Sequence, residues 1–137
     1  MKAIVTGSSG FIGSALVESL RTDGHQVVRL VREKGAGGPD AVLWNPLSGI
    51  PDTSVLEGAD AVFHLAGENI AKGRWTSERK RLIRDSRVVG TRTISTALSE
   101  LESRPKVMVC ASAIGIYGIH PDGTVTEASP PGEDWLA

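Results

Sequence analysis

Three glycines near the N-terminus are spaced as in loops that bind phosphate. They occupy positions 7, 10 and 13 of the stretch TGSSGFIG, which follows a short apolar run and precedes a helical pattern. One glycine allows a tight turn, a second lets the backbone approach a pyrophosphate, and Gly13 lets the helix pack close to the strand. The first amides of that helix lack partners and favour an anion. A purely structural turn is the alternative to a dinucleotide phosphate site, which would comprise Gly7, Ser9, Gly10, Phe11, Ile12 and Gly13.

The end of the next predicted strand bears on which dinucleotide would bind. An NAD site usually has an acidic residue here, hydrogen-bonded to the ribose hydroxyls. In this sequence Val31 occupies that position and Arg32 follows it. Arg32 can pair with a 2′-phosphate and stack on the adenine, whereas Glu33 comes one residue too late and would repel the phosphate. The residues thus favour NADP over NAD, unless Arg32 is only a solvated charge at the end of the strand.

Alternating strands and helices are predicted to position these residues. Apolar runs and turn signals predict helices over residues 11–22 and 76–101, a Gly-rich loop over residues 33–40, and strands over residues 2–5, 26–32, 41–44, 60–65 and 106–113. Strands that alternate with helices over short connections predict a parallel sheet with right-handed crossovers. Since no linker interrupts the pattern, we expect one domain over residues 1–137.

Composition and charge exclude several classes of protein. A chain of 137 residues with 40% hydrophobic content can bury one core. Its net charge of −1 gives no overall attraction to nucleic acid or to a membrane surface, and no stretch approaches the roughly 18 apolar residues of a membrane span. Cys110 is the single cysteine and is expected to be a small buried hydrophobe in a strand. We therefore expect a cytoplasmic protein that binds neither nucleic acid, nor membrane, nor metal.

Several motifs occur together and in order: TGSSGFIG, DAVFHLAG, SRVVGTRTI and SAIGIYG. Together they resemble an extended short-chain dehydrogenase/reductase of the NAD(P)-dependent epimerase/dehydratase type. The segments HLAGENI, RW, SR and SPPGEDWLA are similar to an atypical branch labelled sugar-nucleotide epimerases, some of them cell-division inhibitors. The resemblance covers essentially all of the chain. It implies a Rossmann-type, doubly wound parallel sheet in the order 3-2-1-4-5, with the cofactor along the carboxyl ends of the strands.

The resemblance also implies further cofactor contacts. Leu65 and Ala66 would run their backbone beside the adenosine ribose, and Gly67 would allow a close approach. Arg87 stands where typical members have an Asn that contacts the cofactor, in the pattern N-V-x-G-T. This arginine would reach the pyrophosphate or a substrate anion, or else be a plain surface charge. His64 is expected to pack in the core rather than to take part in catalysis.

The catalytic residues of typical members are not matched. These members use a Ser or Thr on the fifth strand and a Tyr in a Y-x-x-x-K motif, in which the Tyr transfers the proton. Ala113 stands at the Ser/Thr position, and Ser112 one residue earlier faces the other side of a strand, so it is a weak candidate. Tyr117 has no Lys four residues later. By spacing, the Y-x-x-x-K motif would begin at or just past Ala137.

The resemblance leads us to expect the N-terminal, cofactor-binding part of a longer protein without the C-terminal strands and substrate domain. The strand over 106–113 would then be an unprotected edge, and the helix over 76–101 half of a dimer interface, so either is a route to a homodimer. Residues 72–92 carry eight basic side chains against two acidic ones, which would attract an anionic substrate or form a solvated helix face. The pairs Glu68-Asn69 and Arg74-Trp75 resemble substrate-side features of the branch.

Two functions of different classes are open. The first is the NADP-binding part of an oxidoreductase or epimerase that acts on a hydroxyl or carbonyl of a sugar-like or other small substrate, the chain alone being inactive. The alternative is a non-catalytic NADP-binding sensor or regulatory module. Ala113 favours the alternative, whereas the glycine loop and Arg32 fit both.

Overall fold

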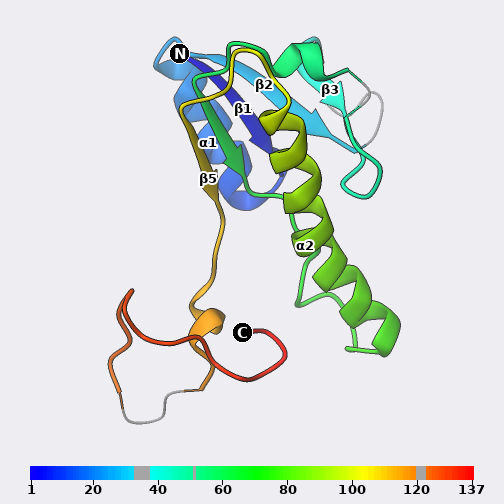
Figure 1. Cartoon of the computed structure of the whole chain (residues 1–137), viewed down its shortest axis with the longest axis vertical. Coiled ribbons are helices and arrows are strands. Elements are labelled where there is room, and N and C mark those ends of the chain that lie inside the picture. Colours follow the sequence, from blue (N-terminus) through cyan, green and yellow to red (C-terminus); the bar gives the residue numbers. More distant parts are fainter. Residues whose placement is uncertain (33–37, 51, 120–122) are drawn as a thin grey trace.

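Five parallel strands form one sheet within the residues that the computed structural model describes, which are 1–32, 38–50, 52–119 and 123–137. Across the sheet the order is β3 (Ala41–Leu43), β2 (Gln26–Val31), β1 (Lys2–Thr6), β4 (Ala61–His64) and β5 (Val107–Cys110) (Figure 1). This order confirms the predicted Rossmann-type sheet. Because neighbouring strands are parallel, the carboxyl ends of β1, β2 and β4 meet at one edge, where the strand order reverses.

Two helices, α1 (Phe11–Thr22) and α2 (Ser77–Ser99), each cover one side of β1. Successive residues of a strand point to opposite faces, and β1 shows this directly. Val5 belongs to a hydrophobic cluster with Val17 of α1, whereas Ile4 belongs to a second cluster with Ile94 of α2. Both faces of β1 are therefore buried, which explains why its sequence is a continuous apolar run rather than an alternating one.

Strand ends differ from the sequence prediction by one to three residues, most of all at β5. This strand ends at Cys110 rather than at residue 113. β4 ends at His64, and the amide of Ala111 donates a hydrogen bond to the His64 carbonyl at 3.0 Å. Beyond that point β4 offers no further partner, so the chain leaves the sheet (Figure 1).

The helices begin and end close to the predicted residues. Thr76 is the N-cap of α2, and its hydroxyl accepts a hydrogen bond from the amide of Arg79. Two short 3₁₀ helices, η1 (Thr53–Leu56) and η2 (Ile114–Tyr117), were not predicted. Residues 33–37 of the predicted Gly-rich loop, Glu33 among them, lie outside the described residues.

β5 forms an edge of the sheet and is largely uncovered. Val107 and Val109 are 48% and 45% exposed. Cys110 is exposed as well, so the expectation that it is buried was wrong. The physical reason is its place on the edge strand, where β4 is the one neighbour it pairs with among the described residues.

The described residues contain neither a candidate membrane-spanning helix nor a candidate metal-binding cluster. None of the helices there is long and apolar enough to cross a membrane. In the same part of the chain, no three His, Cys, Asp or Glu side chains are grouped so as to hold a metal ion.

Candidate functional site

The glycine loop between β1 and α1 requires glycine at two positions. Gly7 has a φ of +66°, and a Cβ added there would lie 2.7 Å from the carbonyl carbon of Leu65. A Cβ on Gly13 would overlap the carbonyl oxygen of Gly7. Larger residues are therefore excluded at both positions. At Gly7 the positive φ and the segment after β4 exclude them, and at Gly13 the backbone of the loop excludes them.

The N-terminus of α1 presents backbone amides to the same region. Gly10 is the N-cap, in an extended conformation, and no side chain of the described residues caps it. Its own amide donates a hydrogen bond to the Gly7 carbonyl at 3.0 Å, which closes the turn. Phe11 and Ile12 follow in the first turn of α1; they are 96% and 67% exposed and do not line the cavity. The uncapped start of a helix suits an anion.

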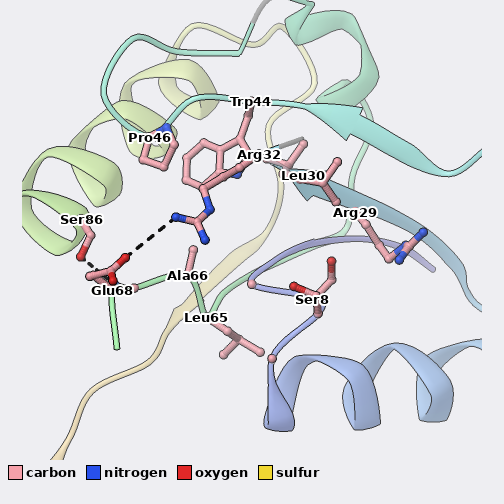
Figure 2. A pocket seen from close by; sticks show the side chains of 15 residues that line it. Ser8, Arg29, Leu30, Arg32, Trp44, Pro46, Leu65, Ala66, Glu68 and Ser86 are labelled. Carbon is pink, nitrogen blue, oxygen red and sulfur yellow. Dashed lines mark hydrogen bonds and ion pairs between the residues drawn. The ribbon is translucent and has the colours of Figure 1, made fainter. Parts of the chain in front are cut away.

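A cavity of about 400 Å³ opens at the carboxyl ends of β1, β2 and β4 (Figure 2). Eight of the predicted cofactor-binding residues line it, namely Gly7, Ser9, Gly10, Val31, Arg32, Leu65, Ala66 and Gly67. The other four are not among the lining residues: Phe11, Ile12, Gly13 and Arg87. The structure thus brings together residues from three separate loops. That they bind a cofactor stays a prediction.

Sequence reasoning missed the wall of the cavity that follows β3. Trp44 and Pro46 line the cavity beside Arg32 (Figure 2). Trp44 is only 2% exposed, and its amide donates a hydrogen bond to the Val31 carbonyl at 2.9 Å. Their positions at the end of a predicted strand and two residues past it could have revealed them, because the loops at the carboxyl ends of parallel strands gather at one edge. Ser8, Arg29, Leu30, Glu68 and Ser86 also line the cavity and were not predicted to do so.

The hydroxyl of Thr6 holds the segment after β4 in place. Its oxygen accepts hydrogen bonds from the amides of Leu65 and Ala66, at 3.2 and 3.1 Å, and lies 2.8 Å from Nδ1 of His64. Since both acceptor sites are used, the hydroxyl hydrogen goes to Nδ1, and His64 carries its own proton on Nε2. His64 is 4% exposed, as expected for a core residue, and burial lowers its pKa. Its ring meets Trp44 edge-on, with 6.0 Å between the centroids.

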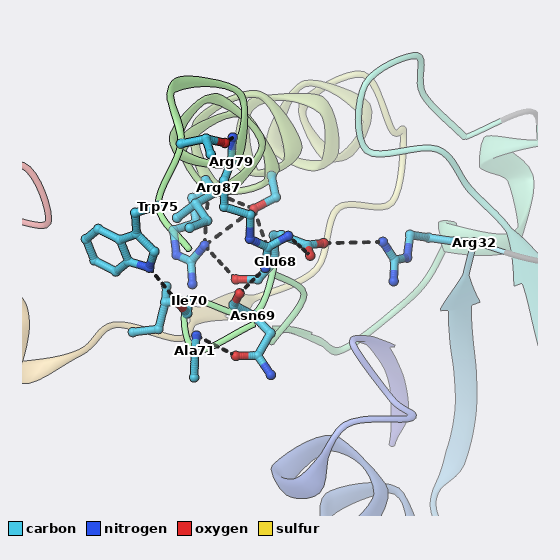
Figure 3. Close-up of polar contacts among 11 residues, drawn as sticks. Arg32, Glu68, Asn69, Ile70, Ala71, Trp75, Arg79 and Arg87 are labelled. Atoms are coloured by element: carbon cyan, nitrogen blue, oxygen red, sulfur yellow. Dashed lines mark hydrogen bonds and ion pairs between the residues drawn. The ribbon is translucent and has the colours of Figure 1, made fainter. Parts of the chain in front are cut away.

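Glu68 brings a carboxylate to the cavity from the segment after β4. One carboxylate oxygen accepts a hydrogen bond from Nη1 of Arg79 at 2.6 Å, and the other lies 3.9 Å from Nη1 of Arg32 (Figure 3). The hydrogen bond from Arg79 lowers the pKa of Glu68, and the charges of Arg79, Arg32 and Lys72 act in the same direction, while burial opposes them. Glu68 is therefore ionised at neutral pH. Its partners come from α2 and from the residue after β2, so no local spacing in the sequence could reveal them.

Arg87 is held by the protein rather than directed into the cavity. Its Nη1 donates hydrogen bonds to the carbonyls of Ile83 and Glu68, at 3.0 and 3.1 Å (Figure 3). A Cβ on Gly67 would lie 3.4 Å from the guanidinium carbon of Arg87. The absence of a side chain at Gly67 thus makes room for Arg87. The predicted contact of Arg87 with a pyrophosphate or a substrate anion stays a prediction.

Much of the basic segment 72–92 is engaged in contacts within the protein. Arg79 binds Glu68 as described, and its side chain is 14% exposed. Arg81 and Arg84 lie 3.8 and 3.6 Å from the carboxylate of Asp85. The local excess of positive charge is therefore partly neutralised on α2 itself, which favours a solvated helix face over a site for an anionic substrate.

Two motifs of the atypical branch meet in the tertiary structure. The rings of Trp75 and Trp135 pack edge-on with 5.4 Å between their centroids. Nζ of Lys80 lies 5.3 Å from the centroid of the Trp135 ring. The segment after η2 thus contacts the beginning of α2, sixty residues earlier in the sequence, and the Arg74-Trp75 pair acquires a packing partner.

The candidate catalytic positions lie away from the cavity. Ser112 lies two residues past the last residue of β5, and Ala113 is the N-cap of η2. Both residues are exposed, and neither lines the cavity. Figure 1 shows the chain running away from the sheet at this point. The structure therefore does not bring Ser112 to the predicted cofactor residues.

A model of the NAD dependent epimerase/dehydratase family matches residues 3–135. The chain belongs to this family. The match agrees with the resemblance inferred from the motif segments. The fold agrees too, because the order of the sheet is the one that the resemblance implied.

Individual members of the epimerase family and solved structures are similar over nearly the whole chain. An epimerase family protein of Mycobacterium leprae (strain TN) is 41% identical over an alignment of 138 positions, which covers 99% of this chain and 44% of the relative. The crystal structure of the human epimerase family protein SDR39U1 (isoform 2) with NADPH has a TM-score of 0.83 and 30% identity, over 99% of this chain and 45% of that one.

A further solved structure, MoeE5 in complex with UDP-glucose and NAD, has a TM-score of 0.79 and 28% identity. The similarity covers 96% of this chain and 42% of MoeE5. Solved structures similar to this epimerase-family chain thus include one with NADPH and one with NAD. The chain spans less than half the length of each of these proteins.

Proposed function

We propose that the chain binds a nicotinamide dinucleotide in the cavity at the carboxyl ends of β1, β2 and β4, with NADP(H) preferred over NAD(H). The observation that carries the proposal is the juxtaposition of the glycine loop and Arg32 on one cavity at the point where the strand order reverses. Open parallel sheets bind their ligands at this point. The dinucleotides of the human SDR39U1 and MoeE5 structures support the class of ligand.

The pyrophosphate belongs at the glycine loop. A Cβ at Gly7 would meet the backbone after β4, and Gly10 leaves the first turn of α1 without a side-chain cap. A backbone with no side chains in the way can approach a phosphate closely, and the helix dipole stabilises the negative charge. The amides of Phe11 and Ile12 would then donate to the phosphate oxygens.

The adenosine belongs between the end of β2 and the segments after β3 and β4. Trp44 supplies an apolar wall, and Leu65 and Ala66 supply backbone that Thr6 holds in place. Arg32 is 74% exposed at the rim, so its guanidinium is free to turn toward a 2′-phosphate. Such a pair has two parallel hydrogen bonds and favours NADP(H).

We further propose that the whole protein is an oxidoreductase or epimerase acting on a hydroxyl or carbonyl of a sugar-like or other small substrate. The bound nicotinamide would supply hydride exchange with the carbon of that group. This chain's own residues would bind and orient the dinucleotide and shield its adenosine from water. The proposal rests on the family, whose name describes epimerases and dehydratases.

A non-catalytic NADP-binding module is the second candidate, and one observation favours it. Ala113 replaces the expected hydroxyl, and Ser112 is exposed and does not line the cavity. A protein that binds NADPH tightly but exchanges no hydride with a panel of nucleotide sugars would support the sensor. Labelled hydride appearing in a product would support the enzyme.

Titration of the chain with NADPH and with NADH, followed by calorimetry and tryptophan fluorescence, tests the cofactor proposal. We expect both to bind, NADPH about tenfold more tightly, which corresponds to about 1.4 kcal/mol of additional binding free energy from the Arg32 contact. Arg32→Met should lower the affinity for NADPH to that for NADH. Arg81→Met, an equally exposed arginine on α2, should change neither affinity. No heat and no fluorescence change with either dinucleotide would contradict binding, and tighter NADH binding would contradict the preference.

A further inference from the structure

Arg32 and Glu68 face each other across the cavity, although they follow different strands. Arg32 comes after β2, Glu68 comes after β4, and β1 lies between these two strands in the sheet. Nη1 of Arg32 is 3.9 Å from one carboxylate oxygen of Glu68 (Figure 2). The ion pair therefore spans the part of the cavity that we assign to the adenosine.

The two partners differ in how firmly they are held. Residues of α2 hold Glu68 at both its backbone and its carboxylate, and Figure 3 shows Arg79 and Arg87 among them. Ser86 accepts a hydrogen bond from its amide at 2.9 Å, Arg87 donates to its carbonyl at 3.1 Å, and Arg79 donates to its carboxylate at 2.6 Å. Arg32, in contrast, is 74% exposed. When the pair opens, Arg32 moves and the carboxylate stays.

The other arginine on the cavity is already engaged. Arg29 donates to the carboxylate of Asp40 at 2.9 Å, and its side chain is 16% exposed. Arg32 is thus the arginine of the cavity lining that is free to meet an incoming anion. Its 3.9 Å contact with Glu68 is longer than a hydrogen bond, and such a pair is weak enough to exchange.

We propose that Glu68 is a fixed competitor for Arg32 that limits how strongly the site distinguishes NADP(H) from NAD(H). This inference rests on the proposed function and names the residue that tunes it. A 2′-phosphate must draw Arg32 away from Glu68 and also lie near the negative charge of this carboxylate. A dinucleotide without that phosphate offers ribose hydroxyls instead, and a carboxylate can accept hydrogen bonds from these hydroxyls. Glu68 thereby supplies, from the segment after β4, the acid that is missing at Val31 on β2.

Removal of the charge tests the proposal. In Glu68→Gln, we expect the Kd for NADPH to fall about threefold to fivefold, which is the worth of one exposed ion pair, and the Kd for NADH to stay or rise. Glu78→Gln is the matched control, because Glu78 is an exposed glutamate in the first turn of α2 that does not line the cavity. It should leave the ratio of the two affinities unchanged.

The double variant Arg32→Met/Glu68→Gln shows whether Glu68 acts through Arg32. The gain in NADPH affinity caused by Glu68→Gln should be smaller when Arg32 is already methionine, because only the direct repulsion between Glu68 and the 2′-phosphate is then removed. A gain of equal size in both backgrounds would overturn the proposal, as would an unchanged or smaller preference for NADPH in Glu68→Gln. If the wild-type chain binds neither dinucleotide, the proposed function fails and this inference fails with it.

A second variant is needed in case Glu68→Gln does not fold, since Arg79 also depends on this carboxylate. Glu68→Asp keeps the charge but withdraws it by one methylene group from Arg32. The preference for NADPH over NADH should then also increase, by a smaller factor than in Glu68→Gln. Thermal unfolding of each variant identifies those that fold, and a folded Glu68→Asp with an unchanged preference would overturn the proposal.

Discussion

The centre of the sheet and its β5 edge differ in how completely their side chains are enclosed. In β1, Ala3, Ile4, Val5 and Thr6 are all 0% exposed, whereas Val107 and Val109 of β5 are nearly half exposed. The exposed side chains continue past β5, to Ile114 at 86%. The candidate cofactor site lies at the carboxyl ends of the enclosed central strands. Ser112, the candidate catalytic residue, follows the exposed edge strand β5. Packing therefore encloses the strand that precedes the glycine loop more completely than the strand that precedes Ser112.

Core substitutions should give the largest difference between the two regions. Ile4→Ala removes a fully buried side chain between the sheet and α2, and we expect a loss of about 2–5 kcal/mol in the free energy of unfolding. Val107→Ala on the exposed edge should lose less than about 1 kcal/mol. Urea denaturation of both variants measures these losses, and similar values would contradict the contrast between centre and edge.

The glycine loop should show the next largest effect. Gly7 and Gly24 both have positive φ, but a Cβ at Gly7 meets the backbone after β4, whereas one at Gly24 meets nothing within 4 Å. Gly24→Ala should therefore cost only the conformational strain of about 1–2 kcal/mol. Gly7→Ala should cost more and abolish binding of NADPH in calorimetry. Retention of binding in a folded Gly7→Ala would show that the loop does not need its close approach to β4.

A pH dependence should follow from His64 at the centre of the sheet. Burial lowers its pKa in the folded chain, so the unfolded chain binds more protons at mildly acidic pH. The stability that neutral His64 contributes is thus present above its unfolded pKa of about 6.5 and is lost as the pH falls below that value. In His64→Asn, the amide oxygen can still accept a hydrogen bond from Thr6, and we expect the stability of this variant to depend less on pH. Denaturation midpoints between pH 7 and pH 5 would show parallel curves if His64 does not titrate in this way.

The smallest effect concerns association through the β5 edge. Exposed edge strands pair with other chains, and Val109 would lie in such a contact. We expect sedimentation velocity to show weak, concentration-dependent association of the chain. Val109→Lys should reduce it, because a charge on an edge strand disfavours pairing, and Leu82→Lys would test the exposed face of α2 in the same way. A sedimentation coefficient independent of concentration would contradict association through either surface.

How far the sequence predicts the site depends on whether a contact is local. The turn at Gly7 and the packing at Gly13 follow from spacing within one loop, and both were predicted. Glu68 was noted as a feature of the family branch. Its contacts with Arg32 and Arg79 were not predicted, because they join three separate elements. The structure also gives Gly67 a neighbour that the sequence did not predict, since Arg87 lies beside it, and the predicted close approach of a cofactor to Gly67 stays a prediction.

The sequence by itself determined the order of the elements, the glycine loop and the absence of an acid at Val31. These are local properties, because backbone conformation and the alternation of apolar residues depend on residues that are close together in the sequence. The tertiary structure alone decided that Trp44 walls the cavity, that Thr6 and His64 hold the segment after β4, and that a carboxylate opposes Arg32. Each of these depends on side chains brought together by the parallel pairing of β1 with β2 and β4 and of β2 with β3. No spacing along the chain encodes such distances, so the charge that faces Arg32 emerges only from the folded sheet.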